Sequence, residues 1–105
     1  MASVSTANIT TSVGNAYVST GNTAITWMTF CNYSAGNVIT NVYVVPSGGT
    51  AGNNNIILSN LLITTNDTYQ LYQAAEKIIL SNGDSIQVSA NANSAITTVS
   101  TYTSI

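Results

Sequence analysis

Only four residues of this 105-residue chain belong to the charged types, and they are the first place to look for chemistry. They are Asp67, Glu76, Lys77 and Asp84, and the chain has no histidine. General acid–base catalysis needs a histidine or a suitably placed carboxylate pair. Asp67 follows Asn66 in a turn signal, and Asp84 closes an Asn-Gly turn. Both are positions where aspartate commonly stabilises a turn. We therefore expect no catalytic residue.

Thiol and metal chemistry have equally little support. Cys31 is the only cysteine, so the chain cannot form an internal disulfide. A reactive thiol needs a cationic or imidazole neighbour, and Cys31 in its strand pattern is expected to be a small buried hydrophobe. A calcium site could be built from Asp67, Asp84 and loop carbonyls, but the sequence has no segment with several closely spaced oxygen ligands to support it. The Gly48–Gly52 loop lacks the lysine and the following helix of a phosphate-binding loop. We expect neither metal nor cofactor.

The composition limits the partners. Charged residues make up 4% of the chain and its net charge is −2, whereas about a quarter of an average domain is charged. This excludes the basic footprint of a nucleic-acid binder. A surface of Asn, Ser and Thr costs less to desolvate than a charged one, which suits a chain that packs against copies of itself. With no signal peptide and no membrane-spanning run in the sequence, we expect a soluble protein made in a cytoplasm or assembled there.

The strongest structural signal is the stretch Ala24–Val45, in which β-branched and aromatic residues alternate with period two around a small-residue loop. This pattern predicts two strands joined as a β-hairpin. One face of the first strand would carry Ile25, Trp27, Thr29 and Cys31, and the other Thr26, Met28, Phe30 and Asn32. Because the only Trp and the only Phe lie here with the only Cys, we expect this hairpin at the centre of the core.

Turn signals divide the rest of the chain into further short strands. Pro46–Asn55 predicts a loop, Asn82-Gly83 a type I′ hairpin turn, and Ser85–Ala90 a strand with Ile86, Val88 and Ala90 facing inward. Residues 73–77 (QAAEK) could form one helical turn at most.

These elements predict an all-β fold, a single antiparallel β-sandwich or small jelly roll of about seven to nine short strands. Residues 14–105 would form this domain. Residues 1–13 would be an N-terminal arm or an edge strand.

The six tyrosines are the most informative polar side chains. Tyrosine is enriched at protein interfaces, although in a strand it is more often the edge of a core. Beside Asn and Gln it could also stack a sugar ring. The sequence leaves these readings open.

Three segments and the apolar C-terminal end of the sequence carry a resemblance; the segments are VYVVPSGGTAGNNN (42–55), NDTYQLY (66–72) and EKIILSNGDSIQVSA (76–90). Together they resemble small structural proteins encoded by tailed bacteriophages, and the resemblance extends over roughly residues 16–105. It implies a virion component on the capsid surface or in the neck or tail, assembled in a bacterial cytoplasm. It carries over no active-site residue.

We therefore expect a non-enzymatic structural protein that forms a homo-oligomer, a trimer or a hexamer, and binds virion proteins such as the major capsid or tail protein. Nucleic acid and membrane are not expected partners. The Pro46–Asn55 loop and the N-terminal arm are expected interface elements, and the expected interface residues are Tyr33, Tyr43, Pro46, Asn54, Tyr69 and Tyr72. The alternative is a glycan-binding module for host recognition.

Overall fold

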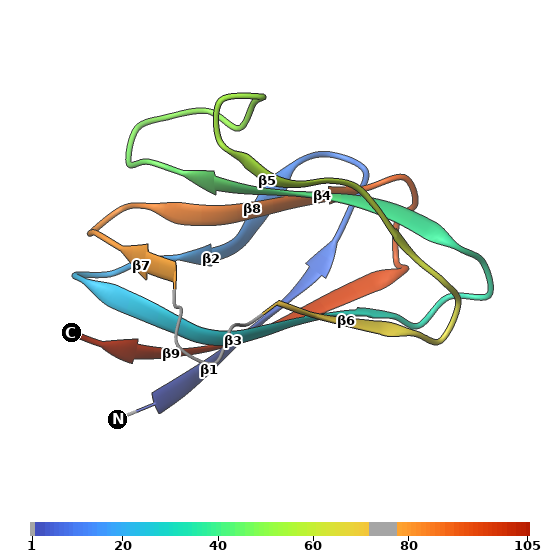
Figure 1. Ribbon diagram of the computed structural model, residues 1–105, viewed down its shortest axis with the longest axis horizontal. Coiled ribbons are helices and arrows are strands. Elements are labelled where there is room, and N and C mark those ends of the chain that lie inside the picture. Colours follow the sequence, from blue (N-terminus) through green and yellow to red (C-terminus); the bar gives the residue numbers. More distant parts are fainter. Residues whose placement is uncertain (1, 72–77) are drawn as a thin grey trace.

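The structure is a computed structural model that describes residues 2–71 and 78–105, with side chains from residue 4 onward. The described residues form nine strands in two antiparallel sheets, stacked as two layers (Figure 1). Sheet A contains, in spatial order, β1 (Ala2–Ile9), β9 (Ile96–Ser104), β3 (Thr23–Asn32) and β6 (Thr68–Leu71), with β7 (Ile78–Leu80) also paired to β3. Sheet B contains β2 (Gly14–Val18), β8 (Ser85–Ala90), β4 (Val38–Val45) and β5 (Ile56–Ile63).

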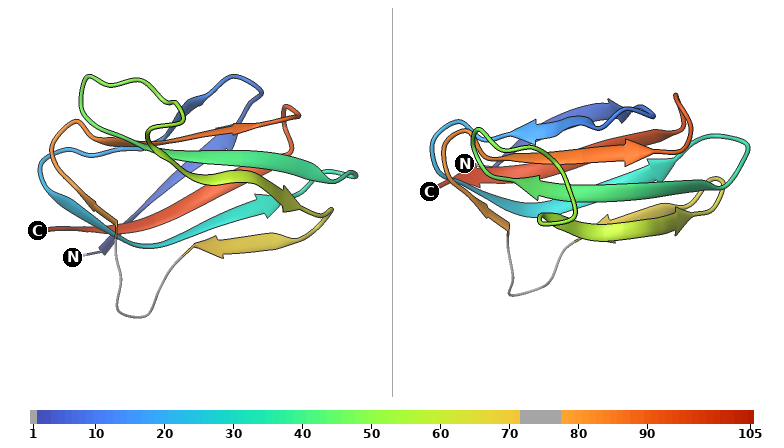
Figure 2. Two further views of the ribbon diagram at one scale, coloured as in Figure 1. Left: turned by 45° about the horizontal axis from the view of Figure 1, so that its top comes forward. Right: turned by 90° about the horizontal axis from the view of Figure 1, so that it is seen from above.

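The strand pairing is that of a jelly roll. The first strand pairs with the last, β2 pairs with β8, β3 pairs with both β6 and β7, and β4 pairs with β5. Folding such a nested set of antiparallel pairs over on itself produces two facing sheets. The prediction of a small antiparallel β-sandwich is confirmed. Figure 2 shows β1 and β2 along one long side of the sandwich and β5 and β6 along the other.

The core lies between the two sheets and follows the period-two pattern of the strands. On β8 the inward residues are Ile86, Val88 and Ala90, as predicted. The largest fully buried apolar side chains of this core are Phe30, Met28, Leu80, Ile86, Ile96, Val38, Val42 and Val88. Both sheets contribute to this one cluster, so each sheet buries its inner face only by packing against the other.

The prediction of a hairpin over Ala24–Val45 is wrong. Both strands form, but β3 belongs to sheet A and β4 to sheet B, so the loop between them crosses from one layer to the other. The buried Asn32 holds this crossing together. Its Nδ2 donates to the carbonyl oxygens of Gly36 (2.9 Å) and Ile63 (2.8 Å), and its Oδ1 accepts from the Ser34 N–H (2.9 Å). This one side chain thus bonds the backbone of the loop and that of β5 in sheet B, where a hairpin would have a ladder of backbone bonds.

The expected place of Trp27 and Cys31 in the core is also wrong. Met28 and Phe30 are fully buried, while Trp27 and Cys31 lie on the opposite, outer face of β3 and are half-buried. The two faces of this strand are similarly apolar, so the alternation alone did not distinguish the inner face from the outer one.

The Asn82-Gly83 turn forms, but it does not close a type I′ hairpin. The Asp84 N–H donates to the Ser81 carbonyl (3.0 Å), and only Gly83 of the central pair has a positive φ, 87°. A type I′ turn needs positive φ at both central residues. The flanking strands β7 and β8 lie in different sheets. The predicted loop Pro46–Asn55 does join a paired hairpin, β4 and β5. The predicted helical turn at 73–77 lies outside the described residues.

Candidate functional site

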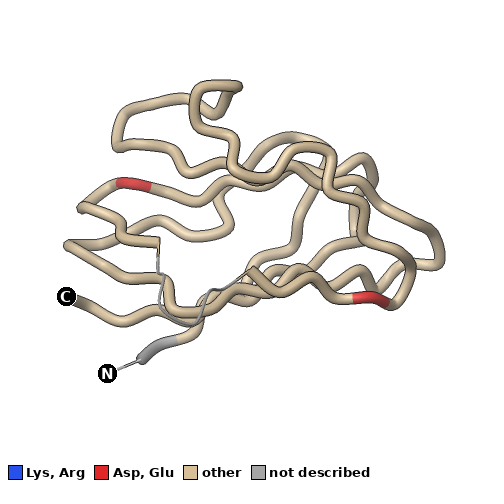
Figure 3. The backbone as a smooth tube through the Cα atoms, viewed as in Figure 1, with Lys and Arg blue, Asp and Glu red and all other residues tan. Residues whose placement is uncertain are grey.

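The two described aspartates lie at opposite ends of the sandwich (Figure 3). The Asp84 carboxylate accepts the N–H groups of Ser47 (2.8 Å) and Ser81 (3.0 Å), so it ties two neighbouring turns together. The Asp67 carboxylate accepts the Thr68 N–H at 2.9 Å. The prediction that both aspartates stabilise turns is confirmed. Glu76 and Lys77 lie outside the described residues.

The described side chains form no cluster suited to a metal. Within residues 4–71 and 78–105, no group of three or more His, Cys, Asp or Glu side chains comes together. Cys31 has Thr97 and Thr68 as its cross-strand neighbours on the outer face of sheet A. Neither neighbour carries a charge that would stabilise a thiolate.

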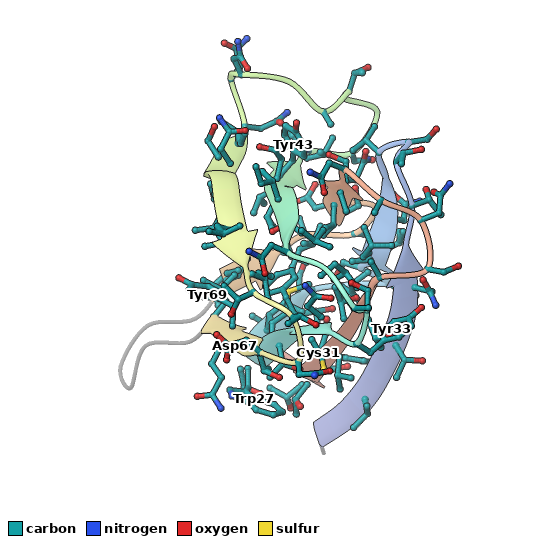
Figure 4. All side chains as sticks on the ribbon, turned by 90° about the vertical axis from the view of Figure 1, so that its right-hand side faces the viewer. Trp27, Cys31, Tyr33, Tyr43, Asp67 and Tyr69 are labelled. Carbon is teal, nitrogen blue, oxygen red and sulfur yellow. The ribbon has the colours of Figure 1, made fainter. Side chains whose placement is uncertain are left out.

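The predicted interface residues are spread over the molecule (Figure 4). Tyr33 is exposed beyond the end of β3, and its hydroxyl accepts a hydrogen bond from Asn8 Nδ2 at 2.9 Å. Tyr69 is half-buried against the core, with its ring centroid 6.3 Å from that of Phe30. Tyr69 is therefore the edge of a core, the alternative that the sequence left open. Tyr72 lies outside the described residues.

The other predicted interface residues lie on β4 of sheet B or in the loop that follows it. Pro46 and Asn54 are exposed in the β4–β5 loop. Tyr43 is half-buried on β4 and lies opposite Ile56, the residue that follows this loop. Tyr43, Pro46 and Asn54 thus share one region of the molecule, and Tyr33 lies near the opposite end.

The outer face of sheet B, here called the B face, is uncharged. Its outward side chains alternate with the buried residues of β4, β5 and β8 and are Ile39, Asn41, Tyr43, Leu62, Gln87 and Ser89. Ile39 lies directly opposite Leu62, and their exposed fractions are 37% and 56%. Tyr43 lies opposite Gln87. The B face therefore combines an exposed aliphatic pair with an aromatic–amide pair.

The outer face of sheet A, here called the A face, is also uncharged over its described residues. It is rich in threonine, with the side chains Val4, Thr6, Asn8, Thr97, Val99, Thr101, Trp27, Thr29, Cys31, Thr68 and Gln70 arranged in cross-strand rows. Sequence reasoning missed Trp27 and Val4 as surface residues. For Trp27 the sequence contained a signal, because the period-two alternation places Trp27 and Phe30 on opposite faces of the strand, so that only one of them can face the core.

No protein-family model matches the chain, and no curated protein matches it either. The described residues contain no helix long and apolar enough to cross a membrane.

Proposed function

We propose that the chain is a non-enzymatic structural protein of a tailed-phage particle, a homo-oligomeric β-sandwich that decorates or cements the capsid or attaches to the neck or tail. One observation supports assembly most directly: both outer sheet faces lack charged side chains over the described residues. Burying hydroxyl and amide groups costs less than burying ions, so such faces can be covered by a neighbouring subunit at low cost. The phage context comes from the resemblance of residues 42–55, 66–72 and 76–90.

The jelly-roll fold is compatible with this proposal. Viral capsid domains and lectins are both built on this architecture. Fold alone does not choose between them, because one fold carries many functions. The proposal therefore depends on the uncharged faces and the resemblance.

The absolute mass of the full chain, measured by light scattering over a dilution series, tests the assembly part of this proposal. We expect a stable oligomer, a trimer or a hexamer, that persists at micromolar concentrations. A monomer at every concentration would overturn the proposal that the protein acts as a homo-oligomer. Incorporation of the labelled protein into particles with a co-expressed major capsid or tail protein then tests the virion part.

A glycan-binding module is the second candidate, and the Tyr43–Gln87 pair on the B face is the observation in its favour. An aromatic ring beside an amide can stack a neutral sugar and bond its hydroxyls. This candidate predicts saturable binding to a glycan array that the Tyr43→Ala substitution abolishes. An array without signal would eliminate it.

A further inference from the structure

The sandwich has several sheet edges, and most of them carry a feature that protects an edge from pairing. Short strands and β-bulges are two such features. On the sheet-B edges, β2 has five residues and a register shift between Asn15 and Tyr17, and β5 has register shifts against β4 with Asn60 at φ 54°. On sheet A, the described part of β6 has four residues and that of β7 three.

The edge strand β1 carries none of these features. Its eight residues pair with β9 in an unbroken register, from Ala2 opposite Thr103 to Ile9 opposite Ile96. The strand contains no proline, glycine or charged residue. Among the described residues it pairs with β9 alone, and it lies on a long side of the sandwich (Figure 2). Val4, at 64% exposure, is the most exposed large apolar side chain within a described strand.

We propose that β1 of one copy pairs antiparallel with β1 of a second copy across a two-fold axis, joining the two A sheets into one continuous sheet. This inference depends on the proposed assembly function and names the contact that performs it. A strand is the partner that fits, because the open edge of β1 presents alternating backbone N–H and C=O groups.

A second copy is the occupant because β1 is complementary to itself. In an antiparallel pair, directly opposite side chains share a face. The outward residues of β1 are Val4, Thr6 and Asn8. Two copies of β1 therefore fit together in any register that places these residues opposite outward residues of the second copy. No like charges meet in these registers, and the partner strand covers part of Val4.

A lysine at Thr6 tests the contact, with a matched control at Gln70. Both side chains are exposed on the A face, and the cross-strand pairings Thr6–Val99, Val99–Thr29 and Thr29–Gln70 place them in one row at opposite edges. In the registers that pair most of β1, Thr6 lies opposite Thr6 or Val4 of the second copy, so Thr6→Lys brings two lysines close together in the pair, where like charges repel. We expect Thr6→Lys to raise the dissociation constant by about tenfold or more, and Gln70→Lys to leave it unchanged. Sedimentation velocity measures both.

Amide exchange in the unmodified chain provides a second measurement that does not depend on a variant. Amides of β1 that point away from β9 are open in a single copy and bonded in the pair. We expect protection of the 2–9 segment to rise with protein concentration, while the β2 and β5 edges stay constant. A 2–9 segment whose exchange is independent of concentration would overturn the inference.

The outcomes separate this inference from the proposed function. A two-fold contact builds even-numbered assemblies. An oligomer that both lysine variants preserve, or a trimer, overturns the β1 contact and leaves the assembly function standing. A monomer at every concentration overturns both. Loss of assembly in Thr6→Lys alone supports both.

Discussion

At the scale of single residues, Asn32 shows how one polar side chain can determine where the chain crosses between sheets. It is fully buried, yet its amide nitrogen and oxygen both have partners in the 33–37 loop, and the nitrogen also bonds β5. A buried amide whose hydrogen bonds are all formed stabilises the fold. If the amide is removed, each buried group that it bonded loses its partner, and the fold bears the desolvation free energy of that group.

We expect Asn32→Ala to lower the free energy of unfolding by about 3 kcal/mol, because it leaves the buried Ile63 carbonyl without its donor and removes the bonds to Ser34 and Gly36 in the loop. Urea unfolding followed by circular dichroism measures the loss. Asn54→Ala, at an exposed loop position, is the control and should change stability by less than about 0.5 kcal/mol. Equal effects at the two positions would show that Asn32 does not hold the crossing.

Ser100 presents the opposite case. Its side chain is fully buried on β9, and its hydroxyl has no hydrogen-bond partner among the described residues. Removing an unpartnered buried hydroxyl removes a desolvation cost, so Ser100→Ala should stabilise the fold by about 0.5 to 1 kcal/mol.

The comparison variant is Thr40→Val. Thr40 is equally buried, but its hydroxyl donates to the Leu61 carbonyl at 3.2 Å, so we expect a loss of about 1 kcal/mol. Thermal melts of the two variants should therefore shift in opposite directions. A destabilised Ser100→Ala would mean that the hydroxyl is satisfied in solution.

At the scale of elements, the positions of the strands could be predicted but several of their partners could not. Period two and turn residues located the strands because these signals are local. The connections after β3 and after β7 contain ordinary turn residues that suit either a hairpin or a crossing. Which one forms depends on contacts such as Asn32 to Ile63, which join residues distant in sequence.

The candidate surface could be predicted only in part, for the same reason. Tyrosine content indicated interfaces, but whether a given tyrosine faces inward depends on which face of its strand the opposite sheet covers. Tyr69 packs against Phe30, while Tyr43 faces outward. The charge-poor character of both faces, by contrast, follows from composition and was available from the sequence alone.

The bulge in β5 allows a prediction at this scale. Asn41 Oδ1 on β4 accepts the N–H of Asn60, the residue with positive φ. We expect Asn41→Ala to cost about 1 kcal/mol and to speed amide exchange at residues 58–61. Ser89→Ala, at the neighbouring position on β8, is the control and should leave exchange in β5 unchanged. Unchanged exchange in both variants would show that the backbone alone maintains the bulge.

At the scale of the whole molecule, the scarcity of charge predicts that the proposed self-association is insensitive to salt. With only four charged residues in the chain, contacts between subunits of the proposed oligomer would depend on apolar burial and neutral hydrogen bonds. Salt screens interactions between charges and leaves these contacts largely unaffected. We expect the dissociation constant of the oligomer to change by less than about threefold between 0.05 and 0.5 M sodium chloride, roughly a decade of ionic strength. A steep salt dependence in the dilution series would indicate ionic contacts between subunits.

The nested strand pairing has a consequence for biosynthesis. β1 pairs with β9, so the earliest of the nine described strands to be synthesised waits for the latest of them. Closing so long a loop is slow, and contacts of this kind lower folding rates. Until β9 emerges, the nascent chain exposes an uncharged strand with both edges open, the condition under which neighbouring nascent chains aggregate. Slower translation would prolong this interval, so the yield of soluble protein should depend on the rate of synthesis.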